Sequence, residues 1–115
     1  MPLYAAQVAY TTEAWQALLR NPQDRLEAVR PAIEKLGGKL VNGWFVFGDY
    51  DVLAVIEMPN NVAAAAIAIA FAAGGACRSV KTTPLLTSAE AVEALKAAGT
   101  AGYRPVTAAA AASKA

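Results

Sequence analysis

Apolar and polar residues alternate with a period of two along several stretches of this chain, which is the pattern of half-buried β-strands. In residues 3–10 the apolar side chains Tyr4, Ala6, Val8 and Tyr10 would share one face. Runs of strand-forming, mainly apolar residues that are bounded by glycine, proline and polar residues predict three further strands. These are residues 39–47, 51–58 and 77–86.

Two helices are predicted between the first and second strands. Thr11-Thr12 is a good cap for a short helix that runs to Arg20, and Asn21-Pro22 is typical of the start of another. Gly37-Gly38 predicts the end of that second helix. Pro31 falls inside it, and we expect a kink there because the apolar stripe continues in phase. The stripe consists of Leu26, Val29, Ile33 and Leu36.

Two more helices are predicted in the second half of the chain. Residues 62–73 follow an asparagine cap at Asn60 or Asn61 and are apolar on all sides, so we expect this helix to be packed on more than one side. Thr87 and Glu90 have the spacing of a capping box, which predicts a last helix over residues 88–98.

The predicted elements follow the order β-α-β-β-α-β, with an additional helix at the C-terminal end. This order is that of the α+β ferredoxin-like fold, in which two helices cover one face of a four-stranded antiparallel sheet. We assign residues 1–98 to this domain. Residues 99–115, rich in alanine, glycine and threonine, are predicted to be a flexible tail.

The second and third strands are apolar on both faces. An antiparallel sheet with helices on one side should have a polar open face, so the pattern predicts self-association through paired sheets. The alternative is that a loop or the last helix covers the far face. In the second strand, one face carries Leu40, Asn42, Trp44 and Val46, and the other carries Val41, Gly43, Phe45 and Phe47. In the third strand, Val52, Ala54 and Ile56 oppose Leu53 and Val55.

Between these strands lies the segment Gly48-Asp49-Tyr50-Asp51. A Gly-Asp pair between two strands predicts a two-residue hairpin turn, with Gly48 at positive φ. We expect Tyr50 to pack near Phe47 and Asp51 to cap backbone amides or pair with a cation. An alternative is a reactive Tyr50/Asp51 pair, but adjacent residues on a strand point to opposite faces.

Composition narrows the functions that are open to the chain. Of its 115 residues, 57% are hydrophobic and 17% are charged, and the net charge is +1, which does not favour nucleic-acid binding. The longest apolar run, residues 62–73, is shorter than the roughly 20 residues of a membrane span, and no signal-peptide pattern is present. Cys77 is the single cysteine, which makes a reducing cytoplasm the expected location.

The chain contains no histidine, and this absence removes several kinds of site. A Ser-His-Asp triad, a haem with a proximal histidine and a Cys/His zinc site cannot be built. The carboxylates lack metal-binding spacing and the glycine pairs lack the spacing of a dinucleotide loop. We therefore predict no metal and no cofactor. Cys77 is expected to act as a small buried apolar side chain more than as a redox thiol.

The segments EKLGGKL, FGDYDVLAVIEMPNN and GGACRSVKT, with the alanine-rich helix between the last two, resemble the GYD domain family. The Gly-Tyr-Asp signature of that family corresponds to Gly48, Tyr50 and Asp51, and the resemblance spans about residues 3–98. It implies a dimeric α/β barrel, in which two sheets pair. The family's biochemical role is not established. Similar hairpins occur in effector-sensing modules, monooxygenases, isomerase-like proteins and haem enzymes, so the fold does not select a function.

A cleft between sheet and helices is the expected binding place, and seven strand residues could reach it: Tyr4, Tyr10, Asn42, Trp44, Glu57, Arg78 and Lys81. Our candidate set is Tyr4, Asn42, Trp44 and Arg78, in which Arg78 could hold a carboxylate. Core packing, an ion pair or simple exposure are the competing roles for these four residues.

The first hypothesis for the function is a cytoplasmic homo-oligomer that binds a small, partly apolar molecule or acts as an assembly module. The alternatives are a cofactor-independent enzyme with a cleft Tyr/Asp and an effector-sensing module that docks on another protein.

Overall fold

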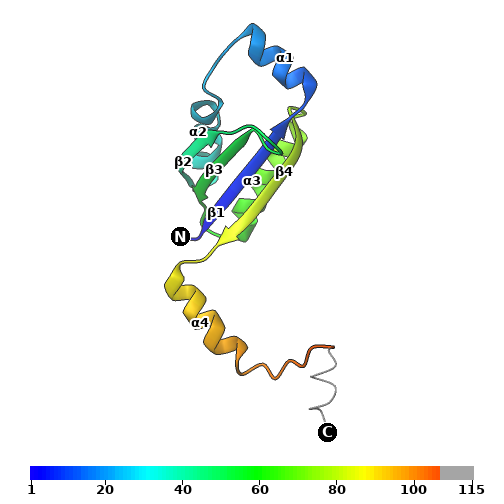
Figure 1. Cartoon of the computed structure of the whole chain (residues 1–115). Coiled ribbons are helices and arrows are strands. Elements are labelled where there is room, and N and C mark those ends of the chain that lie inside the picture. The colour runs from blue at the N-terminus through cyan, green and yellow to red at the C-terminus, as the bar shows by residue number, and fades with distance from the viewer. Residues whose placement is uncertain (107–115) are drawn as a thin grey trace. The chain divides into compact units, whose positions relative to one another are not determined.

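The computed structural model describes residues 1–106, so residues 107–115 of the predicted tail lie outside the described part (Figure 1). The chain divides into one unit over Met1–Leu85 and a second that begins at Leu86, and each is described by itself. The domain boundary expected after residue 98 stays a prediction. The strands are β1 (Leu3–Tyr10), β2 (Lys39–Phe45), β3 (Val52–Glu57) and β4 (Cys77–Leu85). The helices are α1 (Thr12–Arg20), α2 (Arg25–Lys35), α3 (Asn61–Ala73) and α4 (Ser88–Ala98).

The sheet of the first unit is antiparallel, with the strand order β2-β3-β1-β4. This order confirms the predicted ferredoxin-like arrangement. Helices α1, α2 and α3 all contribute side chains to the core on one face of the sheet, while the other face is free of helices in this unit (Figure 1). The alternation along β1 is also confirmed, since Tyr4, Ala6, Val8 and Tyr10 are all buried.

The core is split into two clusters along the sheet. The larger one joins α2 and α3 to the sheet, and Ile33, Ile56 and Ile67 are almost fully buried within it. The smaller one joins α1 to Val8, Tyr10 and Val52 near the other end of β1. Leu26 of α2 and Phe71 of α3 pack against both clusters, so these two side chains are the bridge between them.

The start of α2 differs from the prediction. Asp24 is the N-cap, and its Oδ1 accepts hydrogen bonds from the backbone amides of Leu26 and Glu27 at 3.0 and 3.2 Å. The predicted start at Asn21-Pro22 is therefore wrong: a carboxylate with two amide partners is the stronger cap. The helix runs without a break through Pro31, as expected, whereas the kink stays a prediction.

The Gly37-Gly38 pair ends α2 as predicted. Gly37 has a φ of 84°, and its amide donates to the Glu34 carbonyl at 2.9 Å. The Gly38 amide donates to the Ile33 carbonyl at 3.0 Å. This pair of bonds is the Schellman motif, in which the residue after the cap adopts the left-handed conformation that glycine tolerates.

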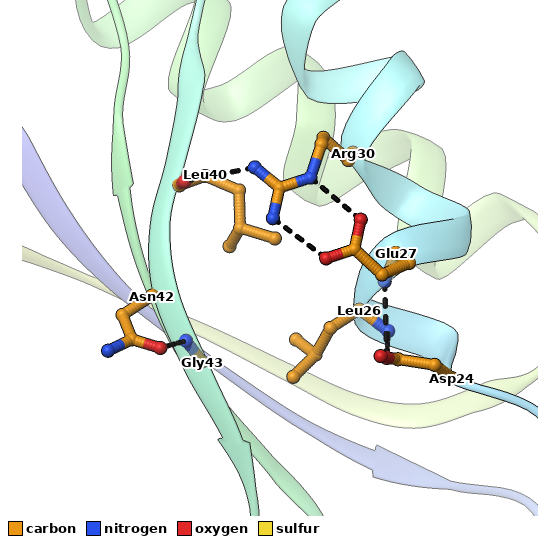
Figure 2. A network of polar contacts seen from close by, with 7 residues as sticks. All are labelled: Asp24, Leu26, Glu27, Arg30, Leu40, Asn42 and Gly43. Carbon is orange, nitrogen blue, oxygen red and sulfur yellow. Dashed lines mark hydrogen bonds and ion pairs between the residues drawn. The ribbon is translucent and has the colours of Figure 1, made fainter.

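A side-chain network fastens α2 to β2 (Figure 2). The guanidinium of Arg30 donates two hydrogen bonds of 2.9 Å to the Glu27 carboxylate and a longer one of 3.4 Å to the Leu40 carbonyl. The ion pair lowers the pKa of Glu27. Because Arg30 holds a carboxylate of its own helix and a carbonyl of the neighbouring strand, it fixes the helix at the point where β2 changes register.

That change of register overturns the predicted faces of β2. Its pairing with β3 shifts between Leu40 and Asn42, so that Leu40 lies opposite Ile56 whereas Asn42 lies opposite Val55. Leu40 therefore faces the helices, but Asn42 and Trp44 face the open side. The prediction that these three residues share a face is wrong, because a β-bulge inserts one residue and inverts the alternation.

The hairpin between β2 and β3 is longer than predicted. The last backbone bond joins the Val46 amide to the Asp51 carbonyl at 2.9 Å, which leaves residues 47–50 as the loop. The prediction of a two-residue turn is therefore wrong, although Gly48 does have the predicted positive φ, of 145°. The expected contact of Tyr50 with Phe47 is also wrong, because Phe47 is fully exposed.

Helix α3 begins at the predicted Asn60 cap but is packed on one side only within its unit. Ala64 and Ile67 are buried, whereas Val62 and Ile69 are 79% and 66% exposed. Within residues 1–85, the expectation of packing on several sides is therefore wrong. In the second unit, α4 has the predicted capping box, with mutual hydrogen bonds between Thr87 and Glu90 of 2.9 and 3.1 Å.

Candidate functional site

A cavity of about 360 Å³ lies between the helix-covered face of the sheet and the three helices of the first unit. It is situated where the two core clusters meet, and both Leu26 and Phe71 line it. β1 and β3 contribute its floor: Ala6, Val8, Tyr10, Val52, Ala54 and Ile56. The other lining residues are Ala14, Ala17, Leu18, Gln23, Arg25, Leu26, Val29, Ile33, Leu40, Ala70, Phe71, Gly74, Ala76 and Cys77.

Small side chains explain why this space is not filled. Each layer around the cavity presents alanine where a core of this fold could carry leucine or isoleucine, and protein interiors are otherwise close-packed. The floor has Ala6 and Ala54, and the helices add Ala14, Ala17 and Ala70. Larger apolar residues complete the lining, so the cavity combines an apolar body with open volume.

Polar groups of the lining come from four residues: Tyr10, Gln23, Arg25 and Cys77. Arg25 is half-buried, and its Nη1 donates a hydrogen bond of 2.9 Å to Gln23 Oε1. Burial raises the pKa of the Tyr10 hydroxyl, although the nearby Arg25 guanidinium acts in the opposite direction. Burial likewise raises the pKa of the Cys77 thiol above its usual 9.0, again opposed by Arg25. Tyr10 and Cys77 are therefore neutral at physiological pH, and Arg25 is the charged group.

The orientation of Tyr10 is fixed from two directions. Its ring packs edge-on against Trp15 of α1, with ring centroids 5.3 Å apart and an interplanar angle of 88°. Its backbone amide donates to Asp51 Oδ2 at 2.9 Å. The Asp51 amide in turn donates to the Val8 carbonyl at 2.8 Å. Asp51 thus caps a backbone amide, one of the two roles expected of it, and it closes the end of β1 directly beside the cavity.

The four residues of the predicted ligand cleft are not among those that line this cavity. Tyr4 is buried on the same face of the sheet, where its hydroxyl donates to Asn61 Oδ1 at 2.6 Å. Asn42 uses its side-chain oxygen to accept from the Gly43 amide at 2.8 Å, as Figure 2 shows. Trp44 lies opposite Leu53 on the open face, and Arg78 is exposed. The bulge in β2 accounts for Asn42 and Trp44, because it turns both away from the helices.

Sequence reasoning included Tyr10 among the strand residues that could reach a cleft, but it missed Arg25 and Gln23. Both precede or open α2, in the segment whose helix start was misplaced. A useful signal was present in the sequence: Arg25 is a basic residue directly after a helix cap, where a negative charge would be favoured. Tyr50 and Asp51 do not line the cavity, so no Tyr/Asp pair of the signature meets there.

Two kinds of feature are absent from residues 1–106. No three His, Cys, Asp or Glu side chains gather in that range in a way that would hold a metal ion. None of its helices has the length and apolar character needed to cross a membrane.

Comparison with known proteins identifies a family for this chain. Neither the curated proteins nor the solved structures contain a similar chain. The model of the GYD domain family, however, matches residues 4–95, which include the sheet except for Leu3, the Gly48-Tyr50-Asp51 signature and the cavity. The match covers most of the 115 residues, and the chain therefore belongs to the GYD domain family.

Proposed function

We propose that this protein binds a small, largely apolar molecule in the cavity between its sheet and helices. The observation that carries the proposal is an alanine-lined space of about 360 Å³, within the range of about 300–1,000 Å³ that ligand sites occupy. The space opens to solvent, because Ala17, Gln23 and Ala70 of its lining are exposed. The rest of the lining is mainly apolar, and a bound molecule would remove that apolar surface from water.

Binding agrees with the lining better than acid–base catalysis does. No carboxylate belongs to the lining within the described residues, and the chain has no histidine. Burial raises the pKa of both Tyr10 and Cys77, so both stay protonated at physiological pH and neither provides a ready base. A cofactor-independent enzyme would need a base within hydrogen-bond reach of its substrate. We therefore place the enzyme hypothesis second.

Filling the cavity tests the proposal. Ala14→Leu adds a branched side chain from α1 into the space, whereas Ala65→Leu makes the same change on the exposed side of α3. Native mass spectrometry of the full chain, purified from its own host, should show a retained small molecule. We expect Ala14→Leu to lose that molecule and Ala65→Leu to keep it.

A second readout uses Cys77, whose thiol lines the cavity. Its alkylation by iodoacetamide, followed at pH 8.5 to 9 because its pKa is raised, should slow when 1-octanol is added as an apolar probe. The proposal is wrong if the purified protein carries nothing and the alkylation rate is the same with and without the probe, in the wild type and in Ala65→Leu alike.

We also propose that the protein self-associates through the open face of its sheet. Trp44 is half exposed there, and Leu53 and Val55 of β3 are partly exposed beside it. These apolar side chains form a patch of the kind that marks an interface. A change of oligomer size on ligand binding would favour the effector-sensing alternative. The cytoplasmic location stays a prediction.

A further inference from the structure

The polar end of the cavity has a single charge and several donors. Of the residues that line it, only Arg25 is charged at physiological pH. The Tyr10 hydroxyl contributes a neutral donor, and the Gln23 amide contributes another. All other lining groups are apolar or, in the case of Cys77, a neutral thiol. The Asp51 carboxylate, which binds the Tyr10 backbone amide, also acts on the Tyr10 hydroxyl, but less strongly than the Arg25 guanidinium does, so the positive charge dominates at this end of the cavity.

Arg25 has no carboxylate partner within residues 1–106, where the one ion pair joins Glu27 to Arg30. The two nearest carboxylates on the helix are both engaged elsewhere. Asp24 accepts the amides of the first turn, and Glu27 accepts two bonds from Arg30. Arg25 itself uses Nη1 to bind Gln23 Oε1. A guanidinium has five donors, so most of its bonding capacity is open to a ligand.

Helix stability does not explain a basic residue at this position. Arg25 is the first residue of α2, and the N-terminal end of a helix carries a partial positive charge that disfavours a cation. Residues that contradict a local structural preference of this kind are often found at functional sites. Here the same position places a half-buried guanidinium at the edge of an apolar cavity.

We propose that the ligand is an apolar monocarboxylic acid, whose carboxylate binds Arg25 with Tyr10 beside it while its apolar body fills the alanine-lined space. This inference rests on the proposed function and adds the chemical class. One guanidinium matches one carboxylate, in the two-bond geometry that this pair prefers. At roughly 30 Å³ for each water-sized group, about 360 Å³ accommodates about a dozen non-hydrogen atoms. Medium-chain and aromatic acids have this size.

Calorimetric titration of the full chain with octanoate, 1-octanol and octylamine tests the class directly. The three probes share one apolar tail and differ in charge. We expect octanoate to bind at least about tenfold more tightly than 1-octanol, and octylamine to bind most weakly. If 1-octanol binds as well as octanoate, the carboxylate class is wrong while the apolar site stands. If no probe binds at millimolar concentration, both proposals fail.

Substitutions of Arg25 test whether this residue causes the preference for octanoate over 1-octanol. Arg25→Gln should lower octanoate affinity about tenfold or more, toward that of 1-octanol, and should leave 1-octanol affinity unchanged. Lys35→Gln, which removes the same charge from an exposed position of the same helix, should change neither. Tyr10→Phe should lower octanoate affinity a few fold.

If circular dichroism shows that Arg25→Gln does not fold, Arg25→Lys replaces it. This variant keeps the charge but loses the two-bond geometry, so its octanoate affinity should be intermediate. Equal octanoate affinity in the Arg25 and Lys35 variants would overturn the proposal.

Discussion

Asp51, the last residue of the family signature, makes hydrogen bonds to two backbone groups of β1. Its carboxylate accepts the amide of Tyr10, and its amide donates to Val8. Both bonds fasten the hairpin to the end of β1, where Tyr10 lines the cavity. The signature therefore contributes to the candidate site indirectly, by fixing the strand end that carries one of its polar groups.

Replacement of Asp51 tests this role. Asp51→Ala leaves the Tyr10 amide without its charged partner and should lower the free energy of unfolding by about 1.5–3 kcal/mol. Asp51→Asn keeps an oxygen acceptor and should cost less than half as much. Asp49→Ala, at the neighbouring exposed acidic residue, should stay within about 0.5 kcal/mol of the wild type. Urea denaturation measures all three, and equal stability of the Asp51 and Asp49 alanine variants would contradict the role.

Gly38 provides a second residue-scale prediction, because it permits close contact between the start of β2 and the end of β3. A Cβ built at Gly38 would lie 2.5 Å from the Glu57 carbonyl oxygen and would overlap with Met58 Sδ. Gly38→Ala should therefore destabilise the fold by about 1–3 kcal/mol or more. Gly74→Ala is the matched control, since φ there is −69° and its Cβ would make ordinary contacts. Thermal unfolding should show no loss for Gly74→Ala, and a similar melting temperature for both variants would contradict the packing argument.

At the level of elements, helix α2 is destabilised by a proline in its interior. Pro31 is exposed and lies within the helix, where it removes the hydrogen bond to the Glu27 carbonyl. Because no buried contact depends on its ring, Pro31→Ala should stabilise the protein, by up to about 3 kcal/mol on the scale of helix propensities. Chemical denaturation would measure the gain. Pro22→Ala, outside the helix, should bring no comparable gain, and a destabilised Pro31→Ala would show that the proline favours the native helix geometry.

Some features of the fold depend on residues that are neighbours in the sequence, whereas others depend on how distant elements pair or pack. The order of strands and helices, the Thr87 capping box and the Gly37-Gly38 helix end follow from neighbouring residues, and sequence alone was sufficient for them. The bulge between Leu40 and Asn42 depends on the register with β3, so period-two alternation could not show it. The cavity depends on how three helices meet the sheet. Alanine content indicated small side chains, but not that six of them would face one space.

At the scale of the molecule, the open face of the sheet has two unlike halves. Trp44, Leu53 and Val55 form an apolar patch beside Asn42 in the half over β2 and β3, whereas Lys81 and Thr83 make the β4 half polar. The bulge brings this about, because it places Trp44 on the same side as Leu53. An apolar patch next to a polar border is the usual anatomy of an interface. The outer face of α3 is the competing surface, since Val62 and Ile69 are exposed on a helix that is apolar after Asn61.

These two surfaces give opposite predictions for the oligomer, which light scattering coupled to size exclusion can separate. The wild type should have a multiple of the chain mass of 11.9 kDa at micromolar concentration. Trp44→Glu places a charge in the apolar half of the open face and should yield the single-chain mass, because an unpaired charge cannot be buried at low cost. Ile69→Glu makes the same kind of change on α3 and should leave the oligomer intact. A wild-type monomer, or dissociation by Ile69→Glu alone, would show that the sheet does not form the interface.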